Sequence, residues 1–290
     1  MRVIYSFTLL VAVLFISCQE TVDADKLLDT EEKVSITSYI SPIDTILRVQ
    51  VSKVLPAIGT VFSNNDDIAN RALFLIEDAI VSITDEDGNT ADFSYLEEEA
   101  IYTSNATNLT ILEGKQYFLS VLVNGQEFNA TCTIPKKAPE ILEIVRIFEN
   151  EFGEAVAEID LTFEDISGER NFYILGGFRM DTFDGESLQI PLFFESDGLL
   201  TDTAEDGITL GETTQVFLNQ EDTGPKEVTL QIAHVNEILY QNIQTSTLNN
   251  NNDGNPFAEF SIAPNNIQGE DIIGVFAGYQ ISEKIIIIEQ

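Results

Sequence analysis

Short segments in which apolar and polar residues alternate dominate the chain from about residue 33 onward. Two of them, 34–40 and 46–51, are separated by the turn sequence Ser41-Pro42-Ile43-Asp44. Alternation with a period of two places successive side chains on opposite faces, which is typical of a half-buried β-strand. The pattern therefore predicts an early pair of strands joined by a turn.

Two hairpins are expected further along. Residues 117–123 and 126–134 flank Asn124-Gly125, a pair that favours the positive φ angles of a two-residue hairpin turn. Residues 79–84 and 90–95 flank a second turn, which contains Asp-Gly. About seven short strands over residues 33–136 predict an immunoglobulin-like β-sandwich.

The chain after residue 139 predicts a second β-rich domain. Pro135-Lys-Lys-Ala-Pro139 interrupts the alternation, so a domain boundary is expected there, between 33–136 and 139–290. Residues 234–248 carry apolar positions at helical spacing and predict one prominent α-helix. The final run 285–288 consists of isoleucines and predicts a central strand buried on both faces. The strands expected in this half are 141–148, 155–163, 171–178, 188–194, 227–232, 271–279 and 281–288.

The first residues predict export. Arg2 precedes an apolar run that is short for a membrane span, and residues 1–17 therefore read as a signal peptide. Leu14-Phe-Ile-Ser-Cys18 resembles a bacterial lipobox, which implies cleavage before Cys18 and acylation of that residue. Several acyl chains would hold the protein on a membrane, and the acidic segment 18–32 would be the tether. The alternative is an ordinary signal sequence with an incidental cysteine.

Charge narrows the classes of partner. The chain has 49 acidic and 14 basic residues, for a net charge of −35. Nucleic acid is excluded as a partner, because phosphates bind clustered lysine and arginine. Apolar residues make up 44% of the chain, enough for a core, so the acidity predicts a strongly solvated surface. Attraction of cations or of a basic partner remains the other interpretation.

No catalytic, cofactor-binding or metal-binding residue is predicted. His234 is the only histidine, no G-x-S-x-G motif is present, and we expect a capping or surface imidazole at the start of the helix. Residues 249–259 superficially resemble a calcium loop, but position 12 of that register is Phe260, so a polar turn is expected. Cys132 lies on the apolar face of its strand and is expected to be buried. Paired carboxylates for hydrolysis stay possible, because so many acidic residues are present.

The chain as a whole resembles the DUF4249 lipoproteins of Bacteroidota. In the first half the resemblance rests on the early strand pair, 79–89, 100–103, 114–117 and 130–135. In the second half it rests on three motifs, Gly254-Asn-Pro-Phe-Ala-Glu259, Asn265-Asn-Ile-Gln-Gly269 and Ile273-Gly-Val-Phe-Ala-Gly-Tyr279. Phe260 stands where the family often has proline. The motif residues to which the resemblance assigns no known role are Gly254, Asn255, Pro256, Phe257, Glu259, Gly274, Phe276, Gly278 and Tyr279.

The resemblance implies an outer-membrane lipoprotein whose gene tends to lie beside that of a TonB-dependent receptor. We therefore expect a non-catalytic binding or accessory component of nutrient uptake, with the receptor barrel and an unidentified nutrient as partners. Glu20 and Asp23 after the lipidated cysteine resemble a signal for the cell surface, so a surface-facing position is expected over a periplasmic one. The alternatives are a surface hydrolase that uses carboxylates and a structural or adhesive surface protein.

Overall fold

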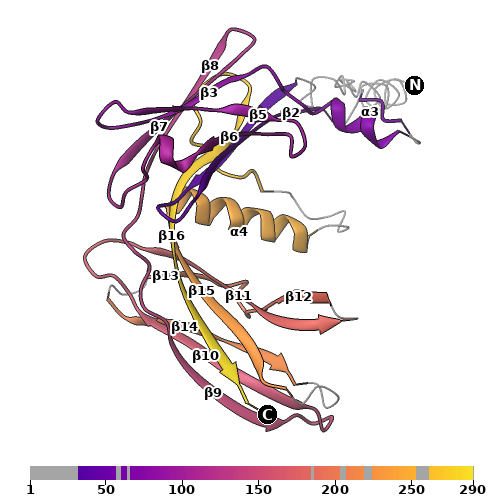
Figure 1. Ribbon diagram of the computed structural model, residues 1–290, viewed down its shortest axis with the longest axis vertical. Coiled ribbons are helices and arrows are strands. Elements are labelled where there is room, and N and C mark those ends of the chain that lie inside the picture. Colours follow the sequence, from indigo (N-terminus) through magenta and orange to yellow (C-terminus); the bar gives the residue numbers. More distant parts are fainter. Residues whose placement is uncertain are drawn as a thin grey trace, which may run out of the picture.

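The protein is mainly β, with two stacked β-sandwiches and one long helix between them (Figure 1). Strand β16 (Ile272–Ile288) runs along both sandwiches, and helix α4 (Glu237–Asn251) lies beside it on the concave side. The computed structural model describes residues 32–56, 60–63, 66–183, 186–202, 207–218, 224–252 and 261–289, without the side chains of 182 and 183.

The first sandwich has the strand order of an immunoglobulin-like fold. One sheet contains the order β1-β2-β6-β5 and the other the order β4-β3-β7-β8. In the standard lettering of immunoglobulin strands, the first order is A-B-E-D, and the second is C-F-G with β4 as an added edge strand beside C. The predicted fold class is thereby confirmed. The strands are β1 (Lys33–Ile40), β2 (Ile46–Val54), β3 (Ile80–Asp85), β4 (Thr90–Asp92), β5 (Ser94–Leu96), β6 (Ile101–Asn105), β7 (Gln116–Val123) and β8 (Gln126–Thr133).

The sequence signals for turns in this half are confirmed. Strands β7 and β8 meet at Val123 opposite Gln126, and the two turn residues have φ of +50° at Asn124 and +85° at Gly125. These angles are those of the tight turn that matches strand twist. Residues 67–72 form the short helix α3 (Asp67–Ala72), and Ala106–Asn108 form a 3₁₀ turn.

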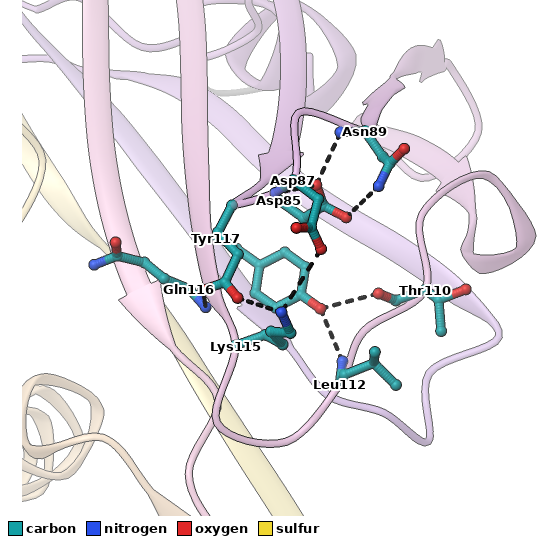
Figure 2. Close-up of polar contacts among 9 residues, drawn as sticks. Asp85, Asp87, Asn89, Thr110, Leu112, Lys115, Gln116 and Tyr117 are labelled. Carbon is teal, nitrogen blue, oxygen red and sulfur yellow. Dashed lines mark hydrogen bonds and ion pairs between the residues drawn. The ribbon is translucent and has the colours of Figure 1, made fainter.

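Tyr117 forms the tyrosine corner that is typical of this fold. Its hydroxyl donates to the carbonyl oxygen of Thr110 at 2.9 Å and accepts from the backbone N–H of Leu112 at 2.8 Å. Figure 2 shows the ring pointing from the start of β7 to this loop, with the Asp85–Asn89 turn beside it. Lys115 lies next to the same turn and pairs with Asp87 at 3.6 Å. The corner therefore ties the loop before β7 to the sandwich.

One predicted strand is wrong in its extent. Residues 90–95 were expected to form a single strand after the Asp-Gly turn, but they divide at Phe93 into β4 and β5. Strand β4 pairs with β3, whereas β5 pairs with β6 in the opposite sheet. Alternation alone does not show where a chain crosses from one sheet to the other.

The second sandwich encloses its own core. Ile159, Leu161 and Phe163 from one sheet pack against Leu230 and Ile232 from the other, all fully buried. The sheets have the orders β14-β10-β9 and β12-β11-β15-β16, with β13 beside β11. The strands are β9 (Leu142–Glu149), β10 (Ala155–Glu164), β11 (Phe172–Phe183), β12 (Glu186–Pro191), β13 (Leu199–Thr201), β14 (Thr209–Phe217) and β15 (Lys226–Val235).

Strands β13 and β14 were not predicted. Strand β14 is rich in polar residues and contains Gly211, both of which weaken the alternating signal. The glycine fits because a Cβ there would lie 2.2 Å from the carbonyl oxygen of Leu161. Close packing of two backbones thus explains a residue that the pattern treats as a strand breaker.

Strand β16 joins the two halves of the chain. The segments 271–279 and 281–288 were predicted as separate strands but form one, which pairs in parallel with β1 over residues 272–278 and antiparallel with β15 over 279–288. Ile267, Ile272 and Phe276 belong to the core of the first sandwich. The division into domains at 33–136 and 139–290 stays a prediction. Strand β16 belongs to the second of these ranges but pairs with β1 of the first, so one sheet contains strands from both.

The expectation that residues 285–288 are buried on both faces is wrong. Beyond Gly278 the strand pairs only with β15 among the described strands, and Ile285 and Ile287 are 62% and 56% exposed. Only Ile288 of this run is buried. A continuous apolar run therefore marks an edge here and not the centre of the sheet.

The predicted helix exists but begins later than expected. Helix α4 spans residues 237–251, with Asn236 as its N-terminal cap, in place of 234–248. Leu239 and Tyr240 pack in a third cluster with Phe172, Val275 and Ala277. His234 lies in β15 and is 5% exposed, so the prediction of a capping or surface imidazole is wrong. The alternation of β15 continues through Val235, and sheet pairing outweighs the helical spacing.

We expect Tyr117→Phe to lower the free energy of unfolding by about 1–3 kcal/mol, because it leaves the Thr110 carbonyl and the Leu112 N–H without their partner. Urea denaturation measures the change. Tyr95→Phe is the matched control, since the Tyr95 hydroxyl is buried without a hydrogen-bond partner and its removal should not destabilise the protein. Equal losses for both variants would contradict this role of the corner.

Candidate ligand-binding site

The residues singled out from the sequence fall into two groups. Cys18 and the motif residues Gly254, Asn255, Pro256, Phe257 and Glu259 lie outside the described residues, as does most of the loop compared with a calcium site. Gly274, Phe276, Gly278 and Tyr279 all lie on β16, in the part that pairs with β1 or directly after it. The structure therefore brings the motif of residues 273–279 to the junction of the two sandwiches.

The two glycines permit close packing of β16. At Gly274 φ is +150°, and a Cβ would lie 1.8 Å from the carbonyl oxygen of Ile36 on β1. At Gly278 a Cβ would lie 2.9 Å from the Ile134 side chain and 3.0 Å from the carbonyl oxygen of Thr133. A side chain at either position would push β16 away from its neighbours, so these glycines have a structural role.

Side-chain amides bind the other edge of β16. Asn266 accepts from the Phe276 N–H at 2.9 Å and donates to the Phe276 carbonyl oxygen at 2.8 Å. Asn236 accepts from the Gly278 N–H at 2.6 Å and donates to the Thr133 carbonyl oxygen at 2.9 Å. Each amide therefore takes the place of a peptide group of a neighbouring strand. Asn266 also explains one residue of the Asn265–Gly269 motif.

Tyr279 differs from the other three motif residues on β16 because its side chain forms a hydrogen bond with a carboxylate, that of Asp44. Its hydroxyl donates to Oδ1 of Asp44 at 2.7 Å, and Oδ2 of the same carboxylate accepts from the Ser41 N–H at 2.7 Å. Burial raises the pKa of Asp44, while these two hydrogen bonds and the nearby Arg48 act in the opposite direction. A half-buried carboxylate is thus held in a fixed orientation by the turn between β1 and β2.

Asp44 and Tyr279 line a hollow of about 300 Å³ on the outer face of the first sandwich. The side chains come from β1, the turn after it, β2, β6 and β16, and Tyr39 is 37% exposed. A tyrosine ring offers a flat apolar surface, whereas carboxylate, guanidinium and amide groups form directed hydrogen bonds. The hollow suits a small polar ligand. Its lining residues are Thr37, Ser38, Tyr39, Asp44, Ile46, Arg48, Gln50, Ile101 and Tyr279.

A larger hollow of about 560 Å³ lies between the two sandwiches, near the start of α4. Its two cations are paired, Lys136 with Glu169 at 2.7 Å and Arg170 with Glu237 at 3.4 Å, and Glu113 adds a further negative charge. The hollow therefore offers little net positive charge to an anionic ligand, and we place the candidate site at Asp44.

His234 also lines this larger hollow, but its contacts give it a structural role. Its Nδ1 lies 2.9 Å from the carbonyl oxygen of Lys136, and its ring lies 5.1 Å from that of Tyr173. Burial lowers its pKa, so the imidazole is neutral at pH 7. It connects β15 to the segment that joins the two halves.

The described residues also bear on other chemistry. Within them, no group of three or more histidine, cysteine or acidic residues is placed to hold a metal ion. Cys132 is buried as expected, and burial raises the pKa of its thiol, which keeps it protonated and unreactive. In the same part of the chain, no helix is both long and apolar enough to cross a membrane.

Comparison with known families identifies the class of the protein. A family model described as Domain of unknown function (DUF4249) matches residues 20–285. The chain belongs to this family, and the resemblance seen in the sequence is confirmed at that level. A search of curated proteins gives no match.

The sequence indicated Tyr279 but not its partners. Thr37 and Tyr39 alternate with buried residues of β1, as Arg48 and Gln50 do on β2, so their outward position follows from the pattern. The parallel pairing of β1 with β16 brings Tyr279 to Asp44, and residues 235 positions apart carry no local signal for it.

We expect Gly274→Ala to lower the free energy of unfolding by about 2–4 kcal/mol, because the added methyl group meets the Ile36 carbonyl oxygen. Thermal and urea denaturation measure the effect. Gly176→Ala on β11 is the control, since a Cβ there would be 3.7 Å from its nearest neighbour, the Gln231 side chain. A Gly274 variant as stable as the control would contradict the proposed close packing.

Tyr279→Phe should raise the pKa of Asp44 further, because the variant lacks the hydroxyl that stabilises the charged carboxylate in the wild-type protein. A native carboxyl with a raised pKa binds its proton at a higher pH than the unfolded chain does, so falling pH stabilises the fold through it. The loss in the variant should be about 1 kcal/mol at pH 7 and should shrink toward about pH 4.

Urea denaturation at several pH values gives this comparison. Tyr39→Phe is the control, because its hydroxyl makes no hydrogen bond to Asp44, and its effect should not vary with pH. A loss in Tyr279→Phe that is constant from pH 7 to about pH 4 would show that the bond does not depend on the charge of Asp44.

Proposed function

We propose that this chain is a lipid-anchored, non-catalytic binding protein of the outer membrane in Bacteroidota, exposed at the cell surface. In this proposal it serves as an accessory of a TonB-dependent receptor barrel and presents a nutrient to it. The observation that carries the proposal is the sequence Leu14–Cys18, which resembles a lipobox, followed by a family match from residue 20 to 285.

The hollow at Asp44 is the binding site in this proposal. Its tyrosine rings and its Asp44, Arg48 and Gln50 side chains suit a small ligand with hydroxyl or other polar groups and one flat apolar face. A site of about 300 Å³ is at the lower end of the range for small-molecule pockets. The ligand would thus be a small unit, or one end of a larger molecule.

The test of this function is co-purification from native membranes in mild detergent. The wild-type chain should recover a receptor barrel, and cells that lack the chain should take up the barrel's nutrient more slowly. Repeated purification without any barrel would remove the main support for the proposal. Deletion with unchanged uptake would favour a structural or adhesive protein.

A carboxylate-dependent hydrolase is the second candidate, and the raised pKa of Asp44 is the observation that favours it. Turnover of a glycan and peptide panel by the wild-type chain, abolished in Asp44→Asn, would support that role. Binding without turnover would support the proposal above.

We expect Cys18→Ala to abolish acylation, so that the chain moves from the membrane fraction to the soluble fraction after cell lysis. Several acyl chains anchor a protein durably, and without them this anchor is lost. Intact mass spectrometry and fractionation measure both effects. Cys132→Ala is the control, because the only other cysteine is buried and should not affect anchoring. A Cys18 variant that stays in the membrane would contradict lipid anchoring.

A further inference from the structure

On one side of the second sandwich, β9 of one sheet and the end of β16 of the other each have a backbone edge that no described strand pairs with. Strand β9 pairs only with β10 among the described strands, and β16 beyond residue 279 pairs only with β15. Lys284 of β16 reaches the carbonyl oxygen of Ile141 at 3.1 Å and also pairs with Glu143 of β9, so the two edges lie side by side at this point. We call this side, formed by residues 142–149 and 281–288, the open seam.

Large apolar side chains are exposed along the open seam. On β9 the exposed fractions range from 38% at Val145 to 60% at Ile144. Val145 and Ile147 lie opposite Ile159 and Ala157, which are fully buried, so both face the core side of the sheet without being covered. The exposed apolar residues are Leu142, Ile144, Val145, Ile147 and Phe148 on β9, with Ile285 and Ile287 on β16.

Two usual protections of an edge strand, shortness and proline, are missing from β9, and Lys284 contacts the edge only at its start, near Ile141 and Glu143. Natural edges are often short, interrupted by proline, or guarded by a charged side chain that points outward. Strand β9 has eight residues and no proline. Its one cation, Arg146, is bound to Asp160 at 2.6 Å and to Glu158 at 2.9 Å, both on the neighbouring strand β10. The guanidinium therefore lies over β10, on the solvent-exposed face of the sheet, and points away from the free edge.

The exposed backbone and apolar side chains of such an edge strand suit an extended peptide as the binding partner. Free backbone N–H and C=O groups pair with another strand, and apolar side chains on both faces contact alternate residues of that strand. The segment from Glu140 to Glu154 carries five glutamates and one arginine, and that arginine is already paired. Glu140 and Glu149 at the two ends of β9 are exposed.

This charge distribution favours a basic partner over a second copy of the chain. Antiparallel pairing of two β9 strands would bring Glu140 of each copy toward Glu149 of the other, in molecules that each carry a net charge of −35. Lysine or arginine at the ends of a partner strand would instead meet these glutamates.

We propose that the open seam binds an extended segment of a partner protein, which adds to β9 as an antiparallel or parallel strand. The segment has apolar residues in its middle and lysine or arginine at its ends. This site is separate from the hollow at Asp44 and does not depend on the function proposed above.

The test uses the full mature chain and a labelled nine-residue peptide in which valine and threonine alternate between pairs of lysines. Fluorescence anisotropy measures affinity, and hydrogen exchange with mass spectrometry locates the bound peptide. The lysine peptide should bind at least tenfold more tightly than a peptide with glutamate in place of lysine, and should slow exchange at residues 142–149.

Ile144→Lys combined with Phe148→Lys should weaken binding of the lysine peptide at least tenfold, because both side chains are exposed on β9. Ile80→Lys combined with Ile43→Lys introduces the same charge at two exposed apolar positions of the first sandwich and should leave binding within about twofold. Circular dichroism and thermal unfolding verify that each variant folds.

Four outcomes would overturn the proposal. They are equal affinity for the two peptides, protection outside β9, equal losses in the two double variants, and sedimentation that shows a dimer dissociated by the β9 substitutions. The last result would assign the open seam to a second copy of the chain.

Discussion

The parallel pairing of β1 with β16 is the contact on which the rest of the structure depends. It extends the first sheet of the immunoglobulin-like sandwich, and the same strand then continues into the second sandwich beside β15. Gly274 makes the approach possible, since any side chain there would meet the backbone of β1. The hollow at Asp44 exists because this pairing brings Tyr279 to the β1–β2 turn.

Where β16 pairs with β1, the backbone groups on its other edge are bound by side chains and not by a strand. In place of another strand, the amides of Asn236 and Asn266 make the hydrogen bonds that a peptide group would make, and Asn236 also reaches the last residue of β8. A fixed pair of donor and acceptor satisfies backbone groups without a further strand. This explains why asparagine residues, usually found in turns, lie next to a buried strand.

Local signals allowed much of the fold to be predicted from the sequence. The Asn124-Gly125 hairpin and the alternation of β1, β2, β7 and β8 depend on neighbouring residues, and all of them agree with the structure. The crossing at Phe93 and the shared strand β16 depend on contacts between distant segments, so they could not be predicted. His234 shows the same limit, because helical spacing after residue 234 competes with sheet pairing that only the fold reveals. For the site, Tyr279 was identified through the family motif, whereas Asp44 required the three-dimensional arrangement.

The order of the strands has a consequence for how the protein is made. Val34 pairs with Ile272, so the first strand of the described chain finds one of its two neighbours only in the last strand. Contacts between such distant residues require closure of a very long loop and form slowly. During synthesis the amino-terminal sandwich cannot be completed until the carboxyl-terminal strand has left the ribosome. Until residues 272–278 of β16 are available, one edge of β1 has no partner strand, so the architecture delays completion of the amino-terminal sandwich.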